Sequence, residues 1–253
     1  MKIEKRNIDI EQSKAFEEKK LQISEKATGY ILEMISSGIY SNPIGSIIRE
    51  LASNCYDAHI ASKQTKPFEV ELIEKNRLTG QFEPKIIFRD FGIGLNKQRV
   101  EDIYIKIFES DKRDSNDYIG AWGIGSKSPL AYSDSFNLVT CVEGVRTMYQ
   151  IQKTADDEIK LITLTEEKYK GENKTEVILS IKQEDVGTFQ DEISDQLFYF
   201  KNIKVTGFTF KSFVPDFETD NILVYADIDN GLGVHAVIGN IKYPLDLKVL
   251  EID

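Results

Sequence analysis

The stretch IIRELASNCYDAH, residues 47–59, has the apolar spacing of a helix that packs against a core. At about 100° per residue around such a helix, Glu50, Asn54 and Asp57 fall within roughly 60° of one another. The adjoining apolar face consists of Ile44, Ile47, Ile48, Leu51 and Cys55. A solvated polar stripe is the plain alternative, although such stripes usually contain Lys or Arg and this one is nearly free of them. The pattern therefore favours a helix that presents a carboxylate, an amide and a second carboxylate in one line.

A second motif follows an apolar run. In IIFRDFGIGL, residues 86–95, the run ends at Asp90, and Gly92 and Gly94 come soon after. An ordinary turn after a strand would also contain Asp and Gly. The functional interpretation is an aspartate at the edge of a pocket, with glycines that let a ligand approach the backbone.

A third motif, GAWGIGSKS at residues 120–128, has three glycines followed by Lys127 and Ser128, a composition typical of a loop that binds phosphate. It is not a Walker A loop, because Ser126 stands where that motif needs a glycine before its lysine. The preceding residues 108–119, FESDKRDSNDYI, are polar, so no strand of a Walker or Rossmann motif leads into it. A glycine-rich connection between two elements remains the alternative for this motif on its own.

Length and composition narrow the class of protein. The chain of 253 residues suits one large domain, or one domain with part of another. A net charge of −10 argues against duplex DNA as the partner, because DNA phosphates attract Lys and Arg. No apolar run approaches the roughly 18 residues that span a bilayer, and the first residues lack the apolar core of a signal peptide. Cys55 and Cys141 fit no metal-binding spacing and indicate a reducing, cytosolic context, and two histidines are too few for a His-based metal site.

The order of the expected elements indicates the fold class. Helices are expected at residues 24–37, 42–62, 96–108, 128–135 and 183–200. Strands are expected at residues 68–74, 84–90, 136–142, 145–152, 158–164, 175–181, 204–213, 221–228 and 234–245. Helices cluster early and strands follow one another in meanders, so the pattern predicts an α+β sandwich and not alternating βαβ units.

The three motifs occur in a fixed order: E-x-x-x-N-x-x-D-A on a helix, D-x-G-x-G after a strand, and G-x-x-G-x-G-x-K-S before a helix. In this order they closely resemble the N, G1 and G2 boxes of the GHKL ATPases. That superfamily includes DNA gyrase B, MutL, the heat-shock chaperone ATPases, histidine kinases and the MORC proteins. The resemblance implies a two-layer α/β sandwich of the Bergerat ATP-binding type, with a mixed, mostly antiparallel sheet and helices on one face.

Within the superfamily, the chain is most similar to the N-terminal region of the phage rapid-lysis rIIA protein family. The segments that carry this resemblance are SKAF (13–16), IYSNPIGSIIRELASNCYDAH (39–59), RDFGIGL (89–95), SDKRDSNDYIGAWGIGSKSPLAYSDSF (110–136) and VIGNIKYPLD (237–246). Of these, SKSPLAYSDSF (126–136) discriminates best, because the wider superfamily does not share it.

The resemblance implies a role for each matching residue. Glu50 matches the general base that aligns and activates the attacking water, and Asn54 matches the Mg²⁺ ligand. Asp57 and Ala58 would shape the pocket beside the nucleotide. Asp90 would accept a hydrogen bond from the adenine amino group, which selects against guanine because guanine presents a carbonyl at that position.

The resemblance also assigns residues around the adenine contact and the phosphates. Thr175 matches the threonine that supports the adenine contact, often through water, although Lys174 stands where the family often has glycine. The glycines after the strand and the glycine loop before the helix would contact the nucleotide and its phosphates. These residues are Gly92, Gly94, Gly120, Gly123, Ile124, Gly125, Ser126, Lys127 and Ser128. Ser110 and Lys112 lie in the expected ATP lid, residues 96–120, and would reach the terminal phosphate on closure, with a fully solvated Lys112 as the alternative.

Three segments are expected along the chain. Residues 1–22 form an N-terminal extension or strap, for which a frayed terminus is the alternative. Residues 23–212 form the ATP-binding domain. Residues 213–253 begin a second, transducer-like domain that the chain leaves incomplete.

Three functional hypotheses follow from these residues. The first is an ATP-hydrolysing conformational switch that uses ATP and Mg²⁺, the second a kinase built on the same pocket, and the third a nucleotide-binding interaction module with little turnover. The resemblance further implies a nucleotide-dependent homodimer, a companion rIIB-like phage protein, and a role in lysis control and superinfection exclusion. The expected location is the cytoplasm of a bacterial host, with peripheral attachment to the inner membrane left open.

Overall fold

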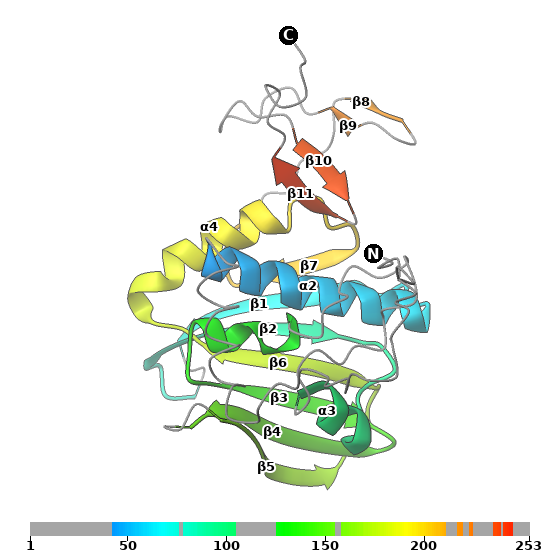
Figure 1. Cartoon of the computed structure of the whole chain (residues 1–253), viewed down its shortest axis with the longest axis vertical. Coiled ribbons are helices and arrows are strands. Elements are labelled where there is room, and N and C mark those ends of the chain that lie inside the picture. Colours follow the sequence, from blue (N-terminus) through cyan, green and yellow to red (C-terminus); the bar gives the residue numbers. More distant parts are fainter. Residues whose placement is uncertain are drawn as a thin grey trace, which may run out of the picture.

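The computed structural model describes residues 42–75, 78–104, 125–154, 158–210, 217–219, 223–224, 235–238 and 240–244. Within these residues, a seven-stranded sheet carries helices on one face (Figure 1). The expected α+β class, with a mostly antiparallel sheet and a layer of helices, is therefore confirmed. No helix in these ranges is both long enough and apolar enough to cross a membrane.

The sheet has the strand order β5-β4-β3-β6-β2-β1-β7, and its neighbours are antiparallel except for β1 and β7, which are parallel. Its strands are β1 (Phe68–Lys75), β2 (Phe82–Asp90), β3 (Ser135–Val142), β4 (Val145–Lys153), β5 (Ile159–Lys168), β6 (Lys174–Ser180) and β7 (Ile203–Thr206). Because β6 lies between β2 and β3, residues from distant parts of the sequence meet at the centre of the sheet.

The helical layer consists of α2 (Pro43–Ser62), α3 (Lys97–Tyr104), α4 (Val186–Gln196) and the short 3-10 helices η2 (Gly125–Ala131) and η3 (Gln183–Asp185). Helix α2 lies over β1 and β2, toward the β7 edge of the sheet, with α4 beside it (Figure 1). It begins where the Asn42 side chain accepts the Gly45 N–H at 2.9 Å. It ends at Lys63, whose φ of 54° is left-handed.

The core forms between α2 and the sheet. Ile47, Ile48 and Leu51 are almost fully buried, and they belong to one apolar cluster with the inward-facing side chains of the strands. In β1, burial alternates along the strand, so Phe68 and Val70 face the core while the side chains between them face outward. The apolar face expected for residues 47–59 is therefore the face on which the helix packs.

Several elements differ from the expected ones. The short helix expected at 128–135 begins earlier, at Gly125, as the 3-10 helix η2, and it contains Pro129, which lacks an amide hydrogen. The helix expected at 183–200 consists of η3 followed by α4 and ends at Gln196. Strand β5 extends to Lys168, whereas β7 stops at Thr206, before Gly207 with its φ of 104°. The helix expected at 24–37 and the N-terminal extension lie outside the described residues.

Two small hairpins lie outside the main sheet. Strand β8 (Phe217–Glu218) pairs with β9 (Leu223–Val224), and β10 (His235–Ile238) pairs with β11 (Ile241–Pro244). In β11, Ile241 is buried and Lys242 forms an ion pair with Asp195 of α4. The expected division into domains at residue 213 stays a prediction.

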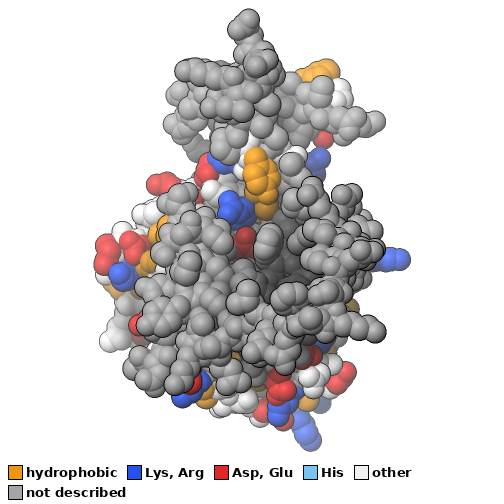
Figure 2. Space-filling view, viewed as in Figure 1, with side chains coloured by type: hydrophobic (Ala, Val, Ile, Leu, Met, Phe, Trp, Pro, Cys, Tyr) orange, Lys and Arg blue, Asp and Glu red, His pale blue; other side chains and the backbone are white. Residues whose placement is uncertain are grey.

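Strand β5 forms one edge of the sheet, far from α2 (Figure 1). Its exposed side chains include Lys160, Glu166, Glu167 and Lys168, and acidic and basic groups are mixed along this rim in Figure 2. The register also shifts between Met148 and the next residue of β4, which marks a bulge. Charges and a bulge at an edge discourage further strand pairing, whereas the exposed Ile162 and Leu164 of β5 favour it.

A ladder of alternating charges crosses β7, β1, β2 and β6 on the sheet face opposite α2. Lys204 bonds Glu69 at 3.1 Å, and Glu69 bonds Arg89 at 2.6 Å. Arg89 in turn bonds Glu176 at 2.5 Å, and Glu176 bonds Lys174 at 2.9 Å. These side chains are 80% or more buried except for Lys204, so they are held more firmly than ordinary surface ion pairs.

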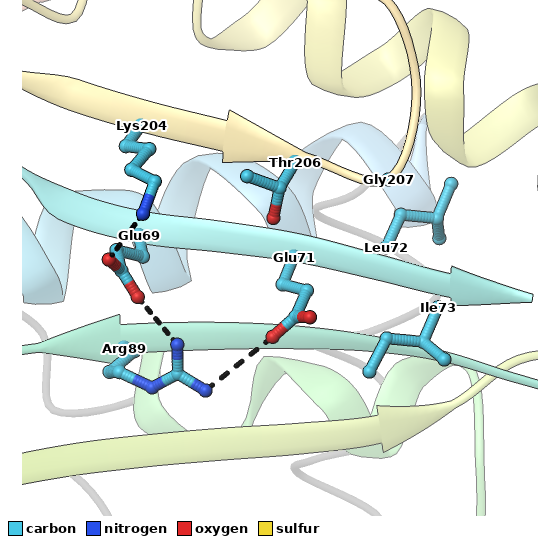
Figure 3. Close-up of a pocket in the computed structure, with 8 residues that line it drawn as sticks. All are labelled: Glu69, Glu71, Leu72, Ile73, Arg89, Lys204, Thr206 and Gly207. Carbon is cyan, nitrogen blue, oxygen red and sulfur yellow. Dashed lines mark hydrogen bonds and ion pairs between the residues drawn. The ribbon is translucent and has the colours of Figure 1, made fainter. Parts of the chain in front are cut away.

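Three charges of this ladder, Lys204, Glu69 and Arg89, line a depression between β1, β2 and β7 together with Glu71, as shown in Figure 3. Within the described part of the chain, each charged group drawn there forms an ion pair: Lys204 with Glu69, and Arg89 with Glu69 and Glu71. These charges satisfy one another. The ion pairs therefore stabilise the sheet, and the charged groups drawn in the depression are not left unpaired for a ligand.

Replacing Arg89 with methionine is expected to lower the free energy of unfolding by about 1–2 kcal/mol, between the values for exposed and for buried ion pairs. Burial alone would raise the pKa values of Glu69 and Glu176, but hydrogen bonds from Arg89 and the neighbouring lysines outweigh it and hold both below the ordinary value. The stabilisation is thus complete above about pH 4.5 and is lost as the pH falls through the lowered pKa values.

Urea denaturation from pH 7 to pH 3 measures this effect. The difference in the free energy of unfolding between the wild type and Arg89→Met should become smaller as the pH falls below about 4.5. A difference that stays constant over the whole range would contradict the electrostatic account, because a loss of packing alone does not depend on pH.

Candidate functional site

Helix α2 carries four of the residues that the sequence assigns to a site. Asp57 is only 1% exposed, whereas Glu50, Asn54 and Ala58 are half-buried. Their spacing along the helix places them beside the apolar face that meets the sheet. The carboxylate, amide and carboxylate of the first motif are therefore partly withdrawn from solvent and do not form a solvated stripe.

Asp90 ends β2 and lies directly opposite Thr175 of β6 in the antiparallel register. Both residues are 8% exposed, and paired residues share a face of the sheet. That face is the one covered by α2, because Asp90 continues the alternation of buried Ile86 and Phe88 along β2. One oxygen of Asp90, Oδ1, accepts the Gly92 N–H at 2.9 Å. The structure thus brings together two residues that the sequence assigned to one adenine contact.

The glycines after Asp90 allow close approach of the backbone. A Cβ added to Gly92 would lie 3.0 Å from the carbonyl oxygen of Ala58, so the loop packs directly on α2. Gly94 has a φ of 76°, and its Cβ would lie 2.9 Å from the Cys141 carbonyl oxygen. Only glycine combines this positive φ with such a close carbonyl oxygen without strain.

The glycine loop meets α2 at Gly125, the first residue of η2. A Cβ built on Gly125 would overlap the carboxylate of Glu50 and would lie 3.3 Å from its Cδ atom. The first and third motifs, far apart in the sequence, are therefore in contact. Within the described residues, the buried hydroxyl oxygens of Ser126 and Ser128 have no hydrogen-bond partner. Two buried hydroxyls beside a carboxylate and a glycine backbone suit a polar ligand such as phosphate.

Lys127 points into the protein. It is 2% exposed, and its Nζ donates a hydrogen bond of 2.6 Å to the Ile103 carbonyl in the last turn of α3. Burial lowers the pKa of Lys127 to about 8. The charge contact with phosphate that the resemblance implies for Lys127 therefore competes with its role in fastening α3 to η2.

Five of the predicted residues, Ser110, Lys112, Gly120, Gly123 and Ile124, lie outside the described residues. Their assignments stay predictions. Inside the described ranges, the predicted site residues lie on α2, at the end of β2, at the start of β6 and at the start of η2.

Four side chains that the sequence did not single out hold the loop after Asp90. His59 accepts the Phe91 N–H, Gln64 donates to the Phe91 carbonyl, Asn173 donates to the Ile93 carbonyl, and Thr140 bonds both polar backbone groups of Leu95. Single polar residues in a helix, a strand or a turn give no periodic signal. Only the position of His59 next to Ala58 in the first motif could have drawn attention to it.

The donor set suits Mg²⁺ better than a transition metal. No cluster of three or more His, Cys, Asp or Glu side chains that could bind a metal occurs within the part of the chain described. Mg²⁺ uses few protein ligands and keeps several waters, so one amide oxygen beside phosphate oxygens is enough. The sequence assigns that amide to Asn54, which is half-buried on α2 one turn beyond Glu50, and this assignment stays a prediction.

An α+β sandwich whose central helix carries Glu50 and Asn54, with Asp90 at a strand end and a glycine loop against the glutamate, has the features of a GHKL-type ATP-binding domain. Curated proteins that match this chain are chaperones. "Chaperone protein HtpG" of Rickettsia bellii (strain RML369-C) is 25% identical over 201 residues, covering 68% of this chain and 32% of the relative.

Further matches carry the same name. HtpG of Halalkalibacterium halodurans is 26% identical over 182 residues, covering 66% of this chain and 28% of the relative. HtpG of Buchnera aphidicola subsp. Cinara cedri is 28% identical over 129 residues, covering 44% and 20%. The chain spans about a third or less of the length of these relatives, and no family model matches it. These distant, partial matches support a GHKL-type ATPase domain in this chain.

Proposed function

We propose that this chain is a Mg²⁺-dependent ATPase domain of the GHKL type that acts as a conformational switch. The observation that carries the proposal is the contact between Glu50 and Gly125. It sets a carboxylate suited to general-base catalysis against the start of the glycine loop, where the phosphates would bind.

Each end of the site has its own task. At the adenine end, buried Asp90 offers an acceptor to the exocyclic amine, and Thr175 lies opposite it. At the phosphate end, the hydroxyls of Ser126 and Ser128 would donate to phosphate oxygens. Asn54 would hold Mg²⁺, which neutralises phosphate charge when bound. Glu50 would take a proton from the attacking water, because that step needs a base within hydrogen-bond reach of the water.

The biological setting is a further part of the proposal and rests on the resemblance to the rIIA family. That resemblance favours a phage protein of the bacterial cytoplasm, active in lysis control and superinfection exclusion together with an rIIB-like companion. The similarity to chaperones is compatible with the same ATP-driven switch, since the superfamily includes the heat-shock chaperone ATPases.

Nucleotide-driven association is the expected output of the switch. We expect a mostly monomeric protein without nucleotide and a dimer with a non-hydrolysable ATP analogue and Mg²⁺, because ATP often lets protomers of this superfamily clasp each other. Light scattering with and without the analogue measures the mass. A mass that stays monomeric at saturating analogue would rule out self-association of this kind.

Gly125→Ala tests the contact that carries the proposal. The backbone there is accessible to alanine, but the new methyl group would displace the Glu50 carboxylate, which is the mobile end of a side chain. We expect turnover to fall about tenfold while stability changes by less than about 1 kcal/mol, because a small misplacement of a catalytic group is costly. Phosphate release measures the turnover, and thermal unfolding measures the stability. Gly187→Ala, a glycine of α4 with open space around it, is the matched control and should leave turnover unchanged.

A binding experiment tests the proposed function as a whole. Isothermal titration calorimetry with ATP and Mg²⁺ should show one site, and chelation of Mg²⁺ should weaken it. Absence of any ATP binding by the folded protein would refute the proposal.

A further inference from the structure

His59 connects α2 to the loop that follows Asp90. It lies one residue after Ala58 and is 5% exposed. Its Nε2 atom accepts the Phe91 N–H at 2.8 Å, and the Gln64 side chain donates to the Phe91 carbonyl at 3.0 Å. Both polar groups of the Phe91 backbone are therefore bound by side chains at the C-terminal end of α2.

These two hydrogen bonds fix Phe91, the residue next to Asp90, which is the proposed adenine contact. Phe91 follows Asp90 and precedes Gly92, whose N–H bonds Asp90 Oδ1. With the peptide of Phe91 fixed to α2, the backbone of Asp90 cannot move away from the helix without breaking a buried hydrogen bond. Such bonds are costly to leave unmade inside a protein.

The bond from Phe91 requires a particular charge state of His59. An imidazole nitrogen accepts a hydrogen bond only while it carries no proton, and both nitrogens are donors in the protonated ring. Neutral His59 can therefore hold Phe91, whereas protonated His59 would turn an N–H toward the Phe91 N–H. Protonation would convert this bond into a repulsive contact.

The surroundings of His59 keep the ring neutral. The rings of Phe68 from β1 and of Phe91 lie 6.1 and 6.2 Å from the imidazole, and they carry no charge. A cation that acts on His59 is Lys66, whose Nζ lies 3.3 Å from the centre of the Phe91 ring and pairs with Glu172. Burial lowers the pKa of His59 below 6.5, the backbone of Lys66 raises it in part, and the Lys66 charge lowers it further.

We infer that His59 is a positioning residue for Asp90, and that its protonation weakens nucleotide binding at the adenine end of the site. The inference rests on the proposed function, because it assigns acid sensitivity to the site proposed there. The contribution of His59 to affinity should be constant above about pH 6.5 and fall at lower pH, since the nucleotide favours the neutral imidazole that is lost on acidification.

Two variants separate this effect from others. His59→Gln places an amide oxygen at about the position of Nε2, so it can accept the Phe91 N–H at every pH. His59→Leu keeps the bulk and removes the acceptor. Nucleotides also take up a proton near pH 6.5, but this contribution is common to all variants and cancels in the comparison.

Calorimetry with ADP between pH 8 and pH 5, with circular dichroism to confirm folding, gives the first reading. The wild type should lose roughly tenfold more affinity than His59→Gln on acidification, the loss expected for one hydrogen bond. His59→Leu should bind roughly tenfold more weakly than the wild type at pH 8. Parallel pH profiles for the wild type and His59→Gln would overturn the inference.

Nuclear magnetic resonance gives a reading that needs no nucleotide. The Phe91 amide signal should titrate together with the His59 ring in the wild type, and it should not titrate over this range in His59→Gln. A Phe91 amide signal that does not change as His59 titrates would overturn the inference whether or not nucleotide binds. A titrating Phe91 amide in a folded protein that binds no nucleotide would instead refute the proposed function and, with it, the effect on affinity.

Discussion

Glu50→Ala is expected to retain ATP binding and to lose most hydrolysis, with a fall in rate of about 10²- to 10⁴-fold, the usual contribution of a general base. The proposed contacts with adenine and Mg²⁺ come from Asp90 and Asn54, so removing the Glu50 side chain leaves them in place. The side chain is half-buried against Gly125 and is thus held where it can act on a water beside the glycine loop.

Phosphate release measures the rate of this variant and calorimetry its affinity. Glu50→Gln keeps the volume beside Gly125 and removes only the basic oxygen, so it should show nearly the same loss of rate. Glu166→Ala, an exposed carboxylate on edge strand β5, serves as the control and should turn over normally. An equal loss of binding and turnover in Glu50→Ala would remove Glu50 from the role of base.

Asp90→Asn is expected to weaken ATP binding about tenfold to a hundredfold. The amide oxygen can still accept the Gly92 N–H, so the loop should keep its conformation. The amide nitrogen then replaces the second carboxylate oxygen and sets a donor against the adenine amine. An unmade buried hydrogen bond to a charged group costs roughly 1.5–3 kcal/mol, which corresponds to this range of affinity.

Calorimetry with ATP and with GTP measures the loss of affinity in Asp90→Asn and shows whether it is specific for adenine. The loss should be larger for ATP than for GTP, because guanine presents a carbonyl that the new donor can bind. Unchanged ATP affinity in Asp90→Asn would refute the adenine assignment.

The sequence predicted the parts of the molecule that depend on local pattern. The apolar spacing around Glu50 indicated α2 within one residue of its observed start. Alternating or continuous apolar runs, separated by turn residues, indicated β1 to β4 and β6. The α+β class followed from the order of these elements. Local pattern also predicted that Asp90 lies at the end of a strand, because an apolar run stops there.

Contacts between distant segments could not be predicted in the same way. The overlap of a Gly125 Cβ with Glu50 depends on how η2 packs on α2, and the pairing of Asp90 with Thr175 depends on how β6 enters the sheet. Periodicity encodes neither. The inward orientation of Lys127 was missed because lysine in a glycine loop is usually solvated or bound to phosphate, whereas here the end of α3 offers the Ile103 carbonyl.

Irregular elements were also beyond local pattern. The 3-10 geometry of η2 has no hydrophobic period of its own. The role of His59 depends on a single acceptor atom meeting a backbone N–H from another element. Both features depend on tertiary contacts and not on a local sequence pattern.

The most direct test of ATP hydrolysis is incubation of the chain with Mg²⁺ and ATP labelled at the γ-phosphate, followed by separation of free phosphate from protein. We predict free labelled phosphate, unlabelled protein, dependence on Mg²⁺ and loss of the signal in Glu50→Ala. Labelled protein would indicate a kinase on the same fold. Tight ATP binding without release of phosphate would indicate an interaction module, and either result would contradict the hydrolysis assigned to Glu50.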